Sequence, residues 1–152
     1  MKALRIVLPI VLGLSLTAVA PAGVAGGTGC HDIDATGVGQ DLGGGNTVAR
    51  ISDGGLLQGT TSASFTITGF SGTVASFEGT ITFTTNRATL TASVAGTLDV
   101  ATGAFSASGS DLSGTGKLAD VTGSLVFNGV ENLATGAFTE VIGGSVCVDL
   151  AP

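Results

Sequence analysis

Apolar and polar residues alternate with period two along most of the chain, and no helical period follows the first 25 residues. One run places four apolar or small residues on a single face, namely Phe77, Gly79, Ile81 and Phe83. The residues between them, on the other face, are Ser, Glu and Thr. The next run does the same with Leu90, Ala92, Val94, Gly96 and Leu98. This alternation is typical of β-strands with one buried face and one face in water.

The segments between these runs are short and have the composition of tight turns. Residues 99–103 and 131–136 match type I turns that end in a left-handed Gly, and the repeated Ala-Thr-Gly-Ala-Phe of residues 101–105 and 134–138 is part of this turn chemistry. About six to eight strands at roughly 10-residue spacing predict one antiparallel barrel or a β-sandwich. Glycines inside strands favour the barrel, because a strand must coil or bulge at its corners: Gly79, Gly96, Gly143 and Gly144.

The N-terminal segment predicts export. Lys2 and Arg5 precede an interrupted apolar run over residues 6–16, and small residues at 23–25 provide a cleavage site. The apolar run is too short for a membrane span. We therefore expect a signal peptide at residues 1–25 and a single secreted domain at residues 26–152, with no membrane anchor after cleavage.

Charge narrows the classes of partner. The expected mature domain has three cations against eleven carboxylates, a net charge of about −8. Such a surface repels nucleic acid and anionic membranes. No motif for a cofactor is present, since Gly116-Lys117 lacks the other residues of a phosphate-binding loop.

The two cysteines, Cys30 and Cys147, lie near the two ends of the mature domain. An even number in an exported protein predicts a disulfide, with two free thiols as the alternative. Closing a loop of this length would stabilise the fold by about 4.7 kcal/mol on the chain-entropy account.

A resemblance adds to this picture. Residues 114–118, Gly-Thr-Gly-Lys-Leu, followed by Gly123, resemble a stretch of the dirigent and allene oxide cyclase barrel superfamily, and residues 124–129 and the Ala-Thr-Gly-Ala-Phe hairpin are similar to its secreted bacterial members. The resemblance covers residues 88–148. It implies an eight-stranded antiparallel calycin-like barrel with an apolar cavity. Plant members steer cyclisation or coupling of unstable hydrophobic intermediates. This chain departs from the pattern at Thr122, where dirigent proteins tend to carry Arg.

The inward positions of such a barrel predict the lining of its lumen: Phe77, Ile81, Phe83, Leu90, Leu98, Phe105, Leu125, Phe127, Phe138 and Ile142. Glu140 shares strand parity with Phe138 and Ile142 and is the one weak candidate for catalysis. Facing an apolar lumen, its carboxyl would have a raised pKa and could act as acid or base. The alternative is a wet barrel mouth, or a bulge that turns the side chain outward.

Metal sites find little support in the sequence. Cys30, His31 and Asp32 lack the second pair of ligands that zinc needs, and His31 is expected to be solvated. The weak calcium candidate comprises Asp32, Asp34, Thr36, Gln40 and Asp41. Its twelfth position is Gly43 instead of Glu, so a solvated acidic loop is favoured.

Nucleophilic catalysis is disfavoured, because the chain has one His and no Gly-x-Ser-x-Gly motif. We expect a non-catalytic protein that either binds a small apolar ligand in its lumen or has a structural or cell-surface role. The alternative is an isomerase or cyclase of the allene oxide cyclase type, or dirigent-like steering of an intermediate. An open or a filled lumen would distinguish these classes, and the oligomeric state is not predicted.

Overall fold

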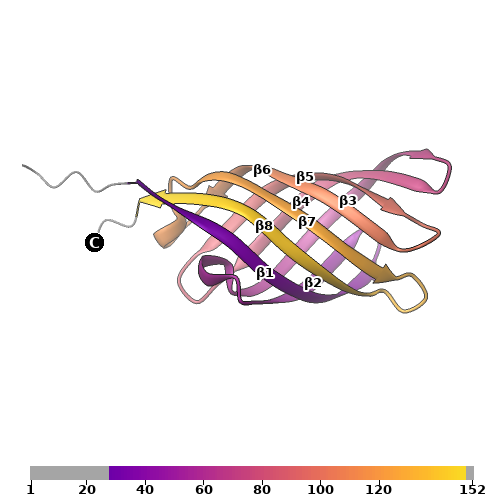
Figure 1. Cartoon of the computed structure of the whole chain (residues 1–152), viewed down its shortest axis with the longest axis horizontal. Coiled ribbons are helices and arrows are strands. Elements are labelled where there is room, and N and C mark those ends of the chain that lie inside the picture. Colours follow the sequence, from indigo (N-terminus) through magenta and orange to yellow (C-terminus); the bar gives the residue numbers. More distant parts are fainter. Residues whose placement is uncertain (1–27, 150–152) are drawn as a thin grey trace, which may run out of the picture.

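A computed structural model describes residues 28–149, which form a closed barrel of eight antiparallel strands (Figure 1). The strands are β1 (Thr28–Gly43), β2 (Asn46–Ser52), β3 (Gly59–Ser71), β4 (Val74–Thr84), β5 (Thr89–Asp99), β6 (Ala104–Gly114), β7 (Thr122–Asn132) and β8 (Ala137–Asp149). Each strand pairs with its neighbours in the sequence, and β8 pairs with β1 to close the barrel. The predicted all-β barrel is confirmed, and the sandwich alternative is wrong.

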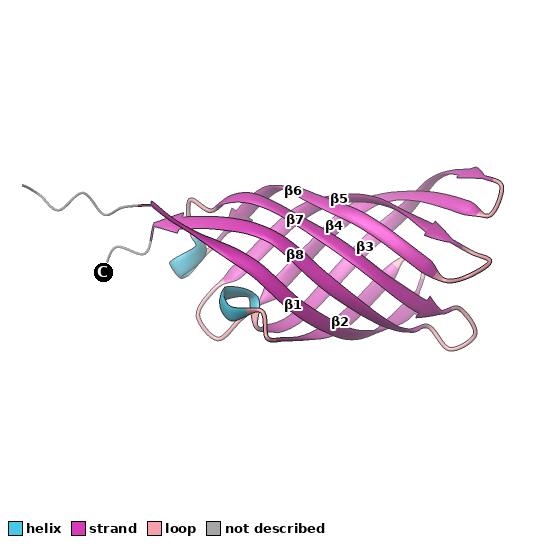
Figure 2. Ribbon diagram, in the orientation of Figure 1, coloured by secondary structure: helices cyan, strands magenta, loops and turns pink. Residues whose placement is uncertain are grey.

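The two ends of the barrel differ. One end, which we call the closed end, carries the short 3-10 helices η1 (Gly55–Leu57) and η2 (Gly116–Leu118) and lies near both ends of the described chain (Figure 2). The opposite end, the open end, carries the β1–β2, β3–β4, β5–β6 and β7–β8 hairpin turns. No helix in residues 28–149 is long and apolar enough to cross a membrane.

Side chains pack the lumen in the half of the barrel next to the closed end. The largest fully buried ones are Phe83, Leu57, Leu90, Leu125, Ile142, Val146 and Val148. Full burial of such a side chain stabilises the fold by about 1.5–3 kcal/mol, so this half supplies much of the core energy. Leu57 and Leu118 come from η1 and η2, so the two 3-10 helices contribute to the seal at this end.

The open-end turns have the predicted chemistry. The Gly103 N–H donates to the Asp99 carbonyl over 2.7 Å, and Gly103 has φ +77°. The Gly136 N–H likewise donates to the Asn132 carbonyl over 2.7 Å, with φ +74°. The turns at residues 99–103 and 131–136 therefore both end in a left-handed Gly, as the predicted turn type requires.

The predicted disulfide between Cys30 and Cys147 is present, and these residues face each other across the β1–β8 ladder. It links the first described strand to the last at the closed end of the barrel. This bond is compatible with an extracytoplasmic location. The predicted signal peptide lies outside the described residues.

Three of the four glycines expected inside strands allow close approach of a neighbouring strand: Gly79, Gly96 and Gly144. A Cβ on the fourth, Gly143, would meet no atom of a neighbouring strand nearer than 4.0 Å. A Cβ on Gly96 would collide with the Ser106 carbonyl on β6. The register shifts lie elsewhere, between Asp41 and Gly43, Ile67 and Gly69, and Thr91 and Ser93. None of the four glycines lies at a register shift, so the bulge expected at these positions is absent.

Candidate functional site: a cavity at the open end

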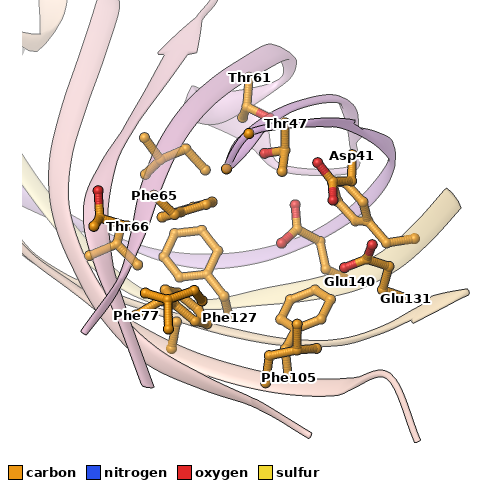
Figure 3. Close-up of a pocket in the computed structure, with 18 residues that line it drawn as sticks. Asp41, Thr47, Thr61, Phe65, Thr66, Phe77, Phe105, Phe127, Glu131 and Glu140 are labelled. Atoms are coloured by element: carbon orange, nitrogen blue, oxygen red, sulfur yellow. The ribbon is translucent and has the colours of Figure 1, made fainter. Parts of the chain in front are cut away.

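A cavity of about 540 Å³ occupies the open half of the barrel (Figure 3). Its walls are mainly apolar and include five of the seven phenylalanines in the chain: Phe65, Phe77, Phe105, Phe127 and Phe138. These come from β3, β4, β6, β7 and β8, so the rings surround the space from several sides. The lumen inside the strands is hollow in the open half and packed in the closed half.

The predicted lumen residues divide between these two halves. Six line the cavity: Phe77, Ile81, Leu98, Phe105, Phe127 and Phe138. Four fill the closed half instead: Phe83, Leu90, Leu125 and Ile142. Phe127 marks the boundary, because it lines the cavity and stacks on Phe83 with 6.3 Å between ring centroids. Strand parity predicts which residues face inward but not how far along the axis the packing extends.

Glycines on adjacent strands make room for the large side chains at the open end. A Cβ on Gly39 of β1 would collide with the Phe138 ring, and one on Gly129 of β7 would collide with the Phe105 ring. These two rings meet edge to face, with centroids 6.0 Å apart. The glycines therefore allow a pair of aromatic rings to form part of the cavity wall.

Glu140 faces this cavity from β8. It pairs in register with Gly37 on β1 and Gly129 on β7, and the ladder has no bulge there. A Cβ on Gly37 would lie 2.6 Å from the Glu140 Oε1 atom, so Gly37 provides the space for the carboxyl group. The residue is only 8% exposed. The wet-mouth and bulge alternatives therefore do not describe this side chain.

Burial raises the pKa of Glu140 to about 7, and no hydrogen bond or neighbouring charge in the described part of the chain offsets that effect. Two further carboxyl groups, Asp41 and Glu131, lie on the same side of the cavity (Figure 3). The pKa of Glu131 is raised by burial and, in addition, by the negative charge of Asp41. The open half of the lumen thus holds three acidic groups.

The rim of the cavity is held by hydrogen bonds between neighbouring segments. The Asp41 N–H donates to the Gly136 carbonyl over 2.7 Å, and the Gln40 side-chain amide donates to the Thr135 carbonyl over 2.5 Å. Both bonds join β1 to the β7–β8 turn. They fix the backbone that carries Asp41 at the mouth.

The basic side chains lie at the opposite end of the barrel, together with carboxylates such as Asp53 and Asp120. A second cavity of about 700 Å³ lies at the closed end, and Arg50, Arg87 and Lys117 line it. They are the only lysine and arginine residues in the described part of the chain. None of the three lines the open-end cavity. Carboxylates therefore lie at both ends of the barrel, whereas the lysine and arginine side chains of the described residues lie only at the closed end.

The calcium-loop hypothesis is wrong, as is the acidic loop that was favoured over it. Residues 28–43 form one continuous strand, so Asp32, Asp34 and Thr36 project in succession from its exposed face and do not converge. The Thr36 hydroxyl instead lies 2.8 Å from that of Ser52. Gln40 bonds to the β7–β8 turn, and Asp41 lines the cavity. No group of three or more potential metal ligands occurs within residues 28–149.

His31 differs from its prediction too. It is not a solvated side chain, because its Nε2 atom is buried without a hydrogen-bond partner in the described structure. The strand places it opposite Val146 and on the same parity as the buried Ile33. Cys30 is occupied by the disulfide, so the two residues form no zinc site.

Several cavity residues were missed in the sequence: Thr47, Thr61, Thr66 and Glu131. The alternation of inward and outward positions could have identified two of them, Thr61 and Glu131. Thr61 has the same parity as Phe65, and Glu131 has the same parity as Phe127. Extending the alternation through polar residues to the end of each strand identifies both.

Comparisons of the chain with protein-family models, with curated proteins and with solved structures gave no match.

Proposed function

We propose that this protein is a non-catalytic binding protein that holds a small apolar ligand in the open half of its barrel. The observation that carries the proposal is a cavity of about 540 Å³ with five phenylalanines in its walls. Sites for small molecules are typically concave, mainly apolar and about 300–1,000 Å³ in volume. A structural role would need no such space, and filling both halves of the lumen would give a larger core.

Several features support a non-catalytic role. General acid–base catalysis requires a positioned acid or base, and a partner that orients it is the usual sign of one. Glu140 faces the cavity, but no hydrogen bond in the described structure shifts its pKa. No His, Lys, Arg, Cys or Ser side chain lines the cavity. The site is suited to hold a molecule and offers little to react with it.

An isomerase or cyclase is the second candidate, and Glu140 is the observation that favours it. A carboxyl with a pKa near 7 can exchange a proton with a bound substrate at neutral pH. Membership of the allene oxide cyclase and dirigent group, which the sequence resemblance suggests, agrees with an eight-stranded barrel and is part of this proposal. So is secretion, with which the disulfide is compatible.

A fluorescent apolar probe tests the binding function. The chain has no Trp or Tyr, so N-phenyl-1-naphthylamine can be excited without protein background. We expect saturable enhancement that is lost in Ala107→Phe, which fills the cavity from β6, and kept in Ser108→Phe, which adds the same ring to the exposed face of β6. Equal binding by both variants, or no saturable binding by the wild type, would contradict the proposal.

Turnover is tested separately. Purified protein is incubated with unsaturated fatty-acid epoxides, and the stereochemistry of the products is followed by chiral chromatography. Stereoselective turnover that Glu140→Gln abolishes, with the circular dichroism unchanged, would replace the binding function by the enzymatic one.

A further inference from the structure

We infer that the cavity selects an organic cation, an apolar amine or quaternary ammonium compound, over neutral or anionic molecules of the same shape. This inference rests on the proposed binding function and specifies the chemical class of its ligand. It is carried by the polar groups that the cavity presents and by the aromatic rings around them.

The polar side-chain atoms of the cavity are all oxygens. Among its eighteen lining residues, the carboxyls belong to Asp41, Glu131 and Glu140, and the hydroxyls to three threonines (Figure 3). No lining side chain carries a nitrogen, so the cavity has no cationic side chain to pair with a carboxylate or phosphate. An ionised carboxylate is only an acceptor. The complementary ligand group is a hydrogen-bond donor or a positive charge.

Of the three acidic groups in the cavity, Glu140 indicates where a cation would bind. Its carboxyl is 8% exposed and lines the cavity, and neither a hydrogen bond nor a cation in the described structure compensates its burial. Burying an ionised group without a partner is unfavourable, whereas an opposite charge within about 4–6 Å stabilises the ionised form. A ligand cation beside Glu140 would provide the missing partner.

The aromatic rings reinforce the same selection. Phe138 lies two residues before Glu140 on the same face of β8 and meets Phe105 edge to face. Phe65 and Phe77 form a second pair with centroids 5.1 Å apart. The faces of aromatic rings attract cations, and quaternary ammonium groups are bound in this way. We place the charged head near Glu140 and the apolar body against Phe77 and Phe127.

The distribution of charged residues also favours a cationic ligand at the open end. Three carboxyls lie at the open-end cavity, while Arg50, Arg87 and Lys117 lie at the cavity of the closed end. The field at the open end therefore attracts cations and repels anions. A ligand with a carboxylate head would meet this field without a cationic side chain in the cavity to pair with.

Competition among three ligands with equal chains tests the inference. Decyltrimethylammonium, decan-1-ol and decanoate are each used to displace N-phenyl-1-naphthylamine at pH 8.5. The two ions stay below their critical micelle concentrations, and the alcohol stays below its solubility limit. We expect the cation to displace the probe at a concentration about tenfold or more below that of the alcohol, with decanoate the weakest. An alcohol that binds as tightly as the cation overturns the inference and leaves the binding function intact. If the probe binds saturably but none of the three ligands displaces it, the inference is wrong and the binding function still stands. If the probe does not bind, the proposed function is wrong.

The pH dependence provides a readout specific to the carboxyls. Decyltrimethylammonium keeps its charge at every pH, so a change in its affinity reports the protein. Between pH 5.5 and 8.5 Glu140 ionises, and we expect the affinity for the cation to rise about tenfold or more while that for the alcohol changes less. An affinity for the cation that is flat over this range overturns the inference.

Two variants locate the effect. Glu140→Gln should lose most of the preference for the cation over the alcohol, whereas Glu78→Gln, on the exposed face of β4, should keep it. If Glu140→Gln does not fold, the double variant Asp41→Asn/Glu131→Gln tests the same acidic group, and we expect a smaller preference there. A full preference in every folded variant of these carboxyls overturns the inference.

Discussion

Replacing Glu140 by Gln should stabilise the barrel at pH 8 and change its pH dependence. Burial raises the pKa of Glu140 from 4.5 to about 7 in the folded protein, so the folded state binds this proton more tightly than the unfolded chain does. At about 1.36 kcal/mol per pKa unit, this difference corresponds to about 3 kcal/mol. The contribution is present below pH 4.5 and is lost as the pH rises to about 7. Glutamine has no charge to bury, so the variant escapes that loss.

The assay is urea unfolding at pH 4.5, 6, 7 and 8.5, with the disulfide intact, for the wild type, Glu140→Gln and the matched control Glu78→Gln. The difference between wild type and Glu140→Gln should grow by about 3 kcal/mol in favour of the variant between pH 4.5 and 8.5. Glu78→Gln should follow the wild type, because Glu78 lies on the exposed face of β4. A constant difference across this range would refute the assignment of a buried, unpartnered Glu140.

Three other perturbations have expected outcomes. Leu125→Ala, in the packed half, should destabilise the protein by about 2–5 kcal/mol in urea unfolding while leaving probe affinity within twofold. Gly37→Ala brings a Cβ to 2.6 Å from the Glu140 Oε1 atom, so it should cost about 1–3 kcal/mol in the same assay and displace the Glu140 side chain. Reduction of the Cys30–Cys147 disulfide should lower the free energy of unfolding by about 2–5 kcal/mol, measured with and without reductant; an equally stable reduced protein would contradict that role.

The barrel could be predicted from the sequence because its strands carry their own local signals. The alternation around Phe77 and Leu90 indicates which faces are buried, and the left-handed Gly103 and Gly136 end the hairpins where the turn composition places them. Pairing between neighbours in the sequence needs little more than short connections. The disulfide followed from the export that the N-terminal segment predicts and from the even number of cysteines.

The cavity could be predicted only in part. Parity placed both Phe77 and Leu90 inside, yet the first lines open space and the second is fully buried. The extent of packing along the barrel axis depends on contacts between distant strands and on the 3-10 helix residues Leu57 and Leu118 that fill the closed end. None of these has a local sequence pattern.

The prediction of an acidic loop was wrong for a different reason. Alternating Asp32, Asp34 and Thr36 match the positions of calcium ligands, but alternation is also the period of a strand. β1 pairs with β8 throughout this segment and with β2 from Thr36 onward. Asp41 shows the same ambiguity, since it was assigned to a metal loop and instead lies at the cavity mouth. A ligand pattern with period two does not distinguish a binding loop from a strand edge.

The central claim is that the open half of the barrel, and not the closed half, receives an apolar molecule. It is tested most directly by an NMR titration of the ¹⁵N-labelled protein with decyltrimethylammonium, followed amide by amide. We expect saturable shifts at Phe77, Phe105 and Phe138, and amides of Leu90 and Leu125 that stay in place. Shifts spread evenly over both halves, or confined to the outer face, would contradict the claim.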